Sequence, residues 1–164
     1  MAVYTKINQN EINIINKNFN IDEVISFKGI KQGIENTNYL LKSKRKKYIL
    51  TIFEKRVLQK EIPFFMKLMD NLNNSKINCP KPLKTKNNKY LIKLKNKTAC
   101  IVSFLEGKDK KILNINDCYT IGKTIARMHV ITKKMKLNRK NSMGIKNLKP
   151  LLKSINLSQR SFQI

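Results

Sequence analysis

The first stretch of the sequence that could carry chemistry is a glycine-containing segment near residue 30. Gly29 and Gly33 are four residues apart, and the polar run Glu35-Asn36-Thr37-Asn38 follows them. Glycine lets a backbone approach a ligand closely, and the amide N–H groups of such a loop can donate hydrogen bonds to a phosphate. The spacing also occurs in ordinary hairpins, and the segment lacks the Gly-Lys-Ser/Thr ending of a P-loop. Its interpretation as a phosphate-binding loop therefore depends on the surrounding elements.

Short β-rich runs on both sides of this loop predict strands. Residues 21–26 lead into a first strand, and residues 39–42 and 48–53 form two more, with the basic residues 43–47 as an exposed turn between them. Residues 98–105 are the most continuous apolar run, which is typical of an interior strand. Two further short strands, residues 83–85 and 90–94, are expected to form a hairpin around an asparagine-containing turn.

Apolar residues at helical spacing predict three helices. Ile12, Ile15 and Phe19 lie on one face of a first helix. A second helix is expected over residues 62–73, with Pro63 in its first turn. Its apolar stripe comprises Phe64, Phe65, Leu68, Met69 and Leu72. A third is expected to run through Val130 from Asn116 as the N-cap.

The order of these elements predicts an α+β fold. Residues 1–105 form a twisted, mostly antiparallel sheet with one helix set into it, and residues 106–164 are helical. The boundary is expected at residues 106–109, where the apolar strand stops at Glu106-Gly107.

Composition narrows the classes of partner. The formal net charge is +25, from 35 Lys and Arg against 10 Asp and Glu. The excess is almost all lysine and is spread along the chain without interleaved aromatic residues, so no specific nucleic-acid partner is expected. A basic, non-catalytic polyanion-binding domain stays as an alternative. No apolar run is long enough to span a membrane and no signal peptide is evident, so a soluble cytoplasmic protein is expected.

The three cysteines do not suggest a metal site or a disulfide framework. Cys79, Cys100 and Cys118 are widely separated, and the chain has only one histidine. We expect buried or half-buried free thiols.

Together these segments resemble the aminoglycoside and choline phosphotransferase family, which has a protein-kinase-like fold. The likeness is greatest to its bacterial homoserine kinase branch and spans nearly the whole chain in the expected order. The matching segments are Val3-Tyr4-Thr5, residues 26–30 and 33–39, residues 48–56, Pro63-Phe64-Phe65, Cys79-Pro80-Lys81-Pro82, residues 101–107, residues 125–129 and Asn141-Ser142-Met143-Gly144.

The resemblance implies transfer of the γ-phosphoryl group of ATP, with Mg²⁺, to the hydroxyl of L-homoserine, a step of threonine biosynthesis. The alternative is another phosphotransferase of the same family that acts on a different small alcohol. The implied fold is a kinase-like N-terminal lobe followed by the first helices of a helical lobe, with a cleft between the loop and the end of the interior strand. The implied nucleotide-binding residues are Gly33, Ile34, Glu35, Asn36, Thr37, Asn38, Thr51, Ser103, Phe104 and Leu105.

The sequence departs from the family pattern at the cation that pairs with the phosphates. Thr51 stands where related kinases place a strand lysine. Lys42, Lys55 and Arg56 are the alternatives, and Glu61 is a candidate for the glutamate that pairs with that lysine.

A second departure concerns the catalytic base and the metal ligands. Relatives carry the base in a His-Gly-Asp loop, but the single histidine, His129, is followed by Val130 and Ile131. None of the aspartates lies in a sequence context typical of a catalytic base or a metal ligand. The four are Asp22, Asp70, Asp109 and Asp117. We therefore predict no catalytic residue and no metal ligand in this chain, and expect the metal ligands beyond residue 164. The chain is interpreted as the N-terminal portion of such an enzyme, with little or no kinase activity by itself.

Overall fold

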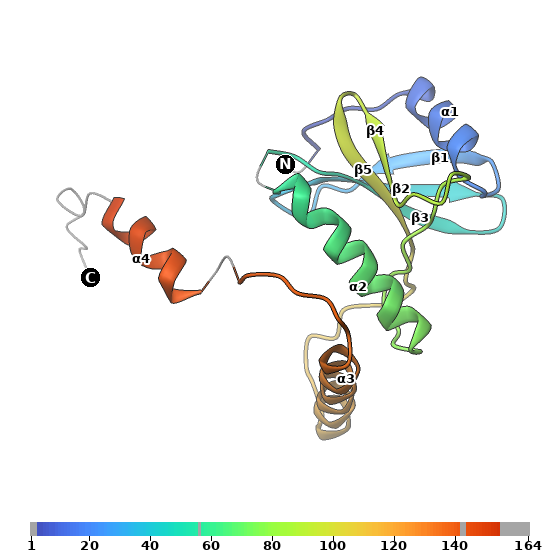
Figure 1. Cartoon of the computed structure of the whole chain (residues 1–164). Coiled ribbons are helices and arrows are strands. Elements are labelled where there is room, and N and C mark those ends of the chain that lie inside the picture. Colours follow the sequence, from blue (N-terminus) through green and yellow to red (C-terminus); the bar gives the residue numbers. More distant parts are fainter. Residues whose placement is uncertain (1–2, 56, 142–143, 155–164) are drawn as a thin grey trace, which may run out of the picture.

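The computed structural model describes residues 3–55, 57–141 and 144–154, and its centre is a five-stranded antiparallel sheet (Figure 1). The strand order is β1-β2-β3-β5-β4. The strands are β1 (Val24–Gly29), β2 (Thr37–Ser43), β3 (Lys47–Ile52), β4 (Leu91–Leu94) and β5 (Lys97–Ser103). The predicted strand–loop–strand–turn–strand unit and the interior strand are therefore confirmed, although β5 ends at Ser103.

Alternation of side chains gives the sheet two different faces. Tyr39, Leu50 and Ile101 are aligned across β2, β3 and β5 and belong to a large buried cluster with helix α1 (Gln9–Asn18). The next positions, Leu40, Ile49 and Val102, are aligned in the same way and point to the opposite face. That face is partly covered by helix α2 (Ile62–Asn74), so we call the two sides the α1 face and the α2 face.

Helix α1 forms as predicted and joins the core. Asn8 caps it, because its side chain accepts a hydrogen bond from the backbone N–H of Asn10 while Glu11 accepts one from the Asn8 N–H. Ile12 and Ile15 are fully buried, and Phe19, directly after the helix, is 1% exposed. The three-residue and four-residue spacing of these side chains therefore marks the packed face.

Helix α2 is also confirmed, but its buried stripe differs from the predicted one. A short 3-10 turn, η1 (Gln59–Glu61), precedes the helix, and Pro63 lies in its first turn. Ile62, Met66 and Leu72 are buried, whereas Phe65 is 37% exposed. Met66 shares one buried cluster with Cys100 and Val102 of β5. Helix α2 therefore packs on the sheet through the face that carries Met66.

The asparagine turn of the predicted hairpin forms, because the Thr85 N–H donates to the Lys89 carbonyl at 2.8 Å, but the two flanking segments do not pair with each other. β4 pairs with β5 instead, through a turn in which Lys95 and Asn96 have φ of 47° and 62°. Residues before the asparagine turn also lie along β5, and the Leu83 N–H donates to the Ile101 carbonyl at 2.8 Å. Both segments therefore pair with the edge of the most buried strand, which leaves fewer unpaired backbone groups than a separate hairpin would.

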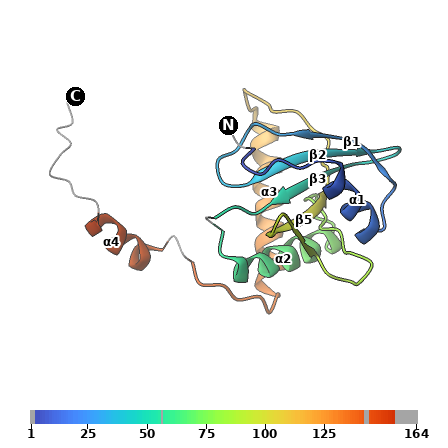
Figure 2. The same ribbon diagram turned by 90° about the horizontal axis from the view of Figure 1, so that it is seen from above.

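Two helices follow the sheet, α3 (Ile115–Lys133) and α4 (Ile145–Ser154). The N-cap of α3 is Asn114 and not Asn116, because the Asn114 side chain accepts from the Asp117 N–H at 2.9 Å and the Asp117 carboxylate accepts from the Asn114 N–H. Figures 1 and 2 show α4 well away from the sheet. The division of the chain at residues 106–109 stays a prediction. None of the helices in the described ranges is long and apolar enough to cross a membrane.

Candidate functional site

The glycine segment forms an exposed loop between β1 and β2. Gly33 has φ of +106°, a conformation that side chains other than glycine rarely adopt. The Ile30 N–H donates to the Asn38 carbonyl at 2.8 Å, which closes the loop at its base. The side chains of Ile34 and Glu35 are exposed.

Asn38 and Thr51 lie side by side on the α2 face. Their backbones are partners in the β2–β3 register, and the Thr51 hydroxyl donates to the Asn38 side-chain oxygen at 2.8 Å. Both side chains are half-buried, so a ligand on this face could reach them.

Of the alternative cations, Lys42 and Lys55 do not join this pair. Lys42 is exposed at the far end of β2, opposite Lys47. Lys55 lines a pocket behind the loop with Ile34, and Arg56 lies outside the described residues. Glu61 accepts two hydrogen bonds from the Arg139 guanidinium, at 2.7 and 3.0 Å.

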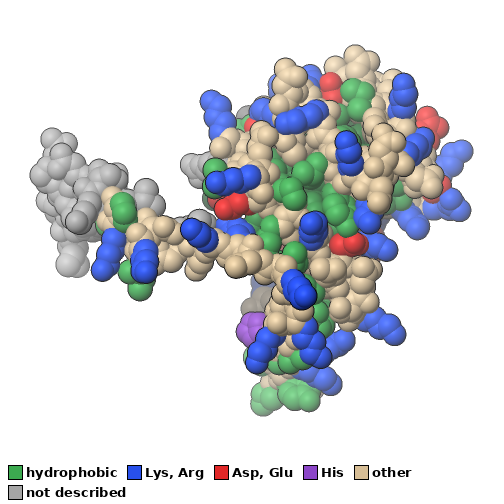
Figure 3. Space-filling model, in the orientation of Figure 1, with side chains coloured by type: hydrophobic (Ala, Val, Ile, Leu, Met, Phe, Trp, Pro, Cys, Tyr) green, Lys and Arg blue, Asp and Glu red, His purple; other side chains and the backbone are tan. Residues whose placement is uncertain are grey.

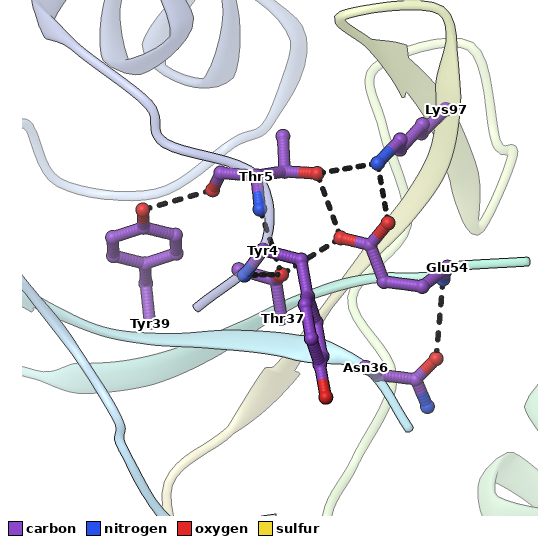
Figure 4. Close-up of polar contacts among 7 residues, drawn as sticks. All are labelled: Tyr4, Thr5, Asn36, Thr37, Tyr39, Glu54 and Lys97. Carbon is purple, nitrogen blue, oxygen red and sulfur yellow. Dashed lines mark hydrogen bonds and ion pairs between the residues drawn. The ribbon is translucent and has the colours of Figure 1, made fainter. Parts of the chain in front are cut away.

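Thr37 and Asn36 turn toward a polar cluster on the other side of the sheet (Figure 4). Thr37 is fully buried, and its hydroxyl donates to a Glu54 carboxylate oxygen at 2.7 Å. Asn36 accepts a hydrogen bond from the Glu54 backbone N–H at 3.3 Å. The Thr37 side chain is therefore unavailable to a ligand on the α2 face, and a contact with phosphate would have to use its backbone.

Glu54 is the centre of that polar cluster. Its carboxylate pairs with Lys97 and also accepts a hydrogen bond from the Thr5 hydroxyl at 2.7 Å. Burial by itself would raise the pKa of Glu54, but the hydrogen bonds from Lys97, Thr5 and Thr37 outweigh it and lower the pKa. The carboxylate is 10% exposed and stays ionised at neutral pH.

The end of β5 carries the other predicted nucleotide contacts. The Ser103 N–H donates to the Lys81 carbonyl at 2.9 Å, and the Phe104 N–H donates to the Lys47 carbonyl at 3.2 Å. Leu105 is 40% exposed, and no described residue accepts a hydrogen bond from its N–H. Of these three amides, the one at Leu105 is available to a ligand.

The loop and the end of β5 open into different pockets. Ile34 and Glu35 line a pocket of about 370 Å³. Ser103 and Phe104 line one of about 530 Å³ with the basic turn between β2 and β3. The β2–β3–β5 register aligns Ser103 with Leu41, four residues along β2 from Thr37, so the two pockets lie at opposite ends of these strands, and the expected shared cleft stays a prediction.

An apolar row, which the sequence did not predict as part of the site, lies between the glycine loop and the end of β5. Leu40, Ile49 and Val102 lie on the α2 face, next to the Asn38–Thr51 pair and toward the Ser103 end of the sheet. Alternation could have identified Leu40 and Ile49, since each is two residues from a predicted site residue on the same strand. The row offers an apolar surface beside a polar pair.

Three of the four aspartates have structural partners, and the carboxylates of the described residues do not form a metal centre. Asp22 pairs with Arg45, which lowers the pKa of the carboxyl, and Asp70 accepts a hydrogen bond from the Tyr90 hydroxyl at 2.6 Å. Asp117 caps α3 and pairs with Lys110, and Asp109 is exposed. Within residues 3–55, 57–141 and 144–154, no group of three histidines, cysteines, aspartates or glutamates could hold a metal ion.

The cysteines and the histidine do not add a reactive group to this surface. Cys100 is buried on the α2 face, and burial raises the pKa of its thiol to about 12. Cys79 is half-buried, whereas Cys118 is exposed, contrary to the expectation of buried or half-buried thiols. His129 is exposed on α3.

The surface charge is dispersed. Figure 3 shows Lys and Arg side chains scattered over the face turned to the viewer, with hydrophobic side chains between them. Several cations of the described residues have acidic partners, among them Arg45 with Asp22 and Lys47 with Glu106. The visible face therefore lacks the continuous basic stripe that characterises a nucleic-acid-binding surface.

Comparison with known proteins identifies relatives of the chain. Residues 26–153 match the family described as the phosphotransferase enzyme family. The homoserine kinase of Paramagnetospirillum magneticum is 39% identical over 155 residues, which are 94% of this chain and 48% of that protein. The homoserine kinase of Rhodopseudomonas palustris is 36% identical over 92% of this chain and 46% of its own length. The chain thus spans about half the length of the curated relatives it matches.

Solved structures share the fold. A spectinomycin phosphotransferase, solved in complex with ADP and spectinomycin, superimposes with a TM-score of 0.65 at 17% identity, over 87% of this chain and 44% of that one. A microcompartment-associated aminopropanol kinase superimposes with a TM-score of 0.63 at 12% identity, over 86% and 48%. The predicted kinase-like N-terminal lobe is confirmed by these likenesses.

Proposed function

The chain belongs to the phosphotransferase enzyme family, and from this premise we propose that it is the nucleotide-binding part of a homoserine kinase. In the proposed reaction the hydroxyl oxygen of L-homoserine bonds to the γ-phosphorus of ATP. The bond from that phosphorus to the β–γ bridging oxygen breaks, ADP leaves, and the hydroxyl proton passes to a base. The observation that carries the proposal is the likeness to homoserine kinases over 92–94% of this chain.

We place the nucleotide along the α2 face. The adenine would lie against Leu40, Ile49 and Val102 and accept a hydrogen bond from the Leu105 N–H. The phosphates would lie about 7 Å further along the strands, the rise of two residues, beside Asn38 and Thr51 and under the glycine loop. The apolar row, the polar pair and the available Leu105 amide support this placement. ADP in the spectinomycin phosphotransferase structure is consistent with a nucleotide on this fold.

The described residues explain nucleotide binding but not the transfer itself. Thr51 supplies a hydroxyl where related kinases carry a cation, so it can orient a phosphate oxygen without neutralising charge. Asp22, Asp70 and Asp117 bind cations, a tyrosine hydroxyl and a helix cap, and the described residues do not fit a Mg²⁺ site. A base and metal ligands would therefore come from residues outside those described.

The first test compares ATP with inorganic tripolyphosphate in calorimetric titrations of the chain. ATP should bind more tightly, because only ATP has a base for the apolar row. Leu40→Ala should lower ATP affinity several-fold and leave tripolyphosphate affinity unchanged, since a small apolar contact is worth about 1 kcal/mol. Leu152→Ala, on the exposed part of α4, is the matched control. Equal affinities for ATP and tripolyphosphate, with a steep log-linear salt dependence, would favour the polyanion-binding alternative.

The second test addresses the acceptor. Residues of the Paramagnetospirillum magneticum homoserine kinase that align with this chain are replaced by this chain, and the chimera is assayed with ATP and L-homoserine, choline or an amino sugar. We expect phosphorylation of homoserine above the other alcohols. A folded chimera that binds ATP but does not phosphorylate homoserine would contradict the proposal.

A further inference from the structure

The segment before α1 runs beside the start of β2, and Figure 4 shows its Tyr4 and Thr5 in contact with Thr37 and Tyr39. We call residues 3–7 the N-terminal strap. The Tyr4 and Thr5 N–H groups both donate to the Thr37 hydroxyl oxygen, at 3.0 and 3.1 Å. The Tyr39 hydroxyl donates to the Thr5 carbonyl at 3.0 Å and accepts from the Ile7 N–H at 3.3 Å. The strap is therefore fixed to β2 through two side chains of that strand.

The side chain of Glu54, which follows β3, stabilises this attachment. Its carboxylate accepts hydrogen bonds from the Thr5 and Thr37 hydroxyls, each at 2.7 Å, and pairs with Lys97. Lys97 also donates to the Thr5 hydroxyl at 2.7 Å. The Thr5 and Thr37 hydroxyls thus each donate one hydrogen bond and accept at least one. This network favours a single arrangement of the strap relative to β2 and β3.

The strap also reaches both arms of the loop. The Tyr4 hydroxyl donates to the Ile34 carbonyl at 2.8 Å, although the Tyr4 ring is 56% exposed. On the other arm, a Cβ at Gly29 would lie 2.9 Å from a methyl group of Val3, closer than real contacts of this kind. The absence of a side chain at Gly29 therefore lets the strap pack against the start of the loop.

The Tyr4 contact determines how a backbone amide of the loop points. In a trans peptide the C=O and the following N–H point in opposite directions. When Tyr4 holds the Ile34 carbonyl on the strap side, the Glu35 N–H is directed away from the strap. This orientation leaves that amide free to donate to an anion outside the strap.

From this geometry we infer that the N-terminal strap sets the conformation of the glycine loop, and that Tyr4 is a positioning residue for the phosphates of the nucleotide. The inference rests on the proposed function, because the ligand of the loop is the ATP proposed there. Tyr4 does not touch ATP; it acts through the Ile34–Glu35 peptide. Loss of its hydroxyl should therefore change loop order and nucleotide affinity more than global stability.

The test is Tyr4→Phe in the full chain, with Tyr90→Phe as the matched control. Tyr90 also loses one hydroxyl hydrogen bond, to Asp70, but that bond joins α2 to the segment before β4. Hydrogen exchange of peptides covering residues 29–38 should be several-fold faster in Tyr4→Phe and unchanged in Tyr90→Phe. The ATP dissociation constant should rise about fivefold in Tyr4→Phe only, the equivalent of one ordinary hydrogen bond.

A second variant tests the strap from the other arm and does not involve the hydroxyl. Gly29→Ala should displace Val3, speed exchange in the loop and weaken ATP binding. The double variant Val3→Ala/Gly29→Ala removes the clashing methyl group and should restore most of the affinity. A direct clash between the new methyl group and the nucleotide would not be relieved by Val3→Ala, so rescue is specific to the strap.

The outcomes separate this inference from the proposed function. Unchanged loop exchange in Tyr4→Phe, or faster exchange with unchanged ATP affinity, overturns the positioning role. Absence of rescue in the double variant also overturns it. If the wild-type chain binds no ATP, the proposed function fails, while the exchange measurements still support or overturn the control of the loop by the strap.

Discussion

The sheet unit, residues 3–105, and the helices that follow it bury their apolar side chains to very different extents. The buried hydrophobic residues of the described chain all lie between Ile7 and Val102. Helix α3 has none, and its Ile121 and Ile125 are 46% and 47% exposed. The sheet unit therefore has a core on each face, whereas α3 has an apolar side with little covering it.

This difference locates the source of stability. Burial of apolar surface is the main favourable term in folding, so the sheet unit contributes most of the free energy of unfolding. Helix α3 is held locally by its N-cap and by few contacts with α2. A contact between the two parts is made by Arg139, whose guanidinium donates to Glu61 and lies 5.0 Å from the centre of the Phe65 ring.

The largest effect should come from removing a core side chain of the sheet. Leu50 is fully buried between β2 and β5, so Leu50→Ala should lower the free energy of unfolding by about 2–5 kcal/mol. Ile125→Ala on α3 is the matched control and should cost less than about 1 kcal/mol, since its side chain is half exposed. Urea denaturation measures both. Equal losses of unfolding free energy in Leu50→Ala and Ile125→Ala would contradict the difference between the sheet unit and α3.

A smaller effect is expected from the polar cluster behind the loop. Glu54→Gln should cost about 1–3 kcal/mol, because it removes the charge that Lys97, Thr5 and Thr37 share. The folded-state pKa of Glu54 is below its ordinary value of 4.5, so its stabilising contribution is present above that value and is lost as pH falls through the folded pKa.

Denaturation curves between neutral pH and pH 3 test this linkage. The wild type should lose stability faster than Glu54→Gln as the pH falls below the ordinary value. Identical pH dependence in the two proteins would show that Glu54 is not a source of acid sensitivity.

The smallest change in the free energy of unfolding should come from removing helices α3 and α4. A chain that stops after Gly107 loses the Arg139–Glu61 pair but, among the residues whose burial the structure describes, no buried hydrophobic side chain. Its sheet unit should unfold with a free energy within about 1 kcal/mol of the full chain, since a partly exposed ion pair contributes about 0–1 kcal/mol. Thermal unfolding followed by circular dichroism measures this. A truncated chain without a cooperative transition would show that the sheet unit needs the helices.

Prediction from the sequence succeeded where the signal is local. Ile12, Ile15 and Phe19 at helical spacing identified α1, and the apolar run of residues 98–105 identified β5, which ends two residues earlier, at Ser103. Boundaries were less accurate, as the N-cap of α3 shows: Asn114 and Asn116 are both plausible caps, and the side chain of Asp117 decides between them.

The sequence proposed the candidate site as a set of residues without their arrangement. Glycine spacing and the family resemblance indicated the loop and the strand end, and their role in nucleotide binding stays a prediction. The side of the sheet on which each residue lies was not, so Thr37 was grouped with Asn38 although their side chains point to opposite faces. Tyr4 and Glu54 were not singled out, because their partners are 30 and 49 residues away in sequence.

The sequence by itself determined the type and order of most elements, because helix and strand periodicity depend on neighbouring residues, and its ordered motifs carried the resemblance to the family. Only the tertiary structure decided that β4 and residues 81–83 both pair with β5, which side chains share the α2 face, and how the N-terminal strap meets the glycine loop. Strand pairing and such contacts join residues far apart in the chain, so they depend on which long-range arrangement buries the most apolar surface and leaves the fewest polar groups unpaired.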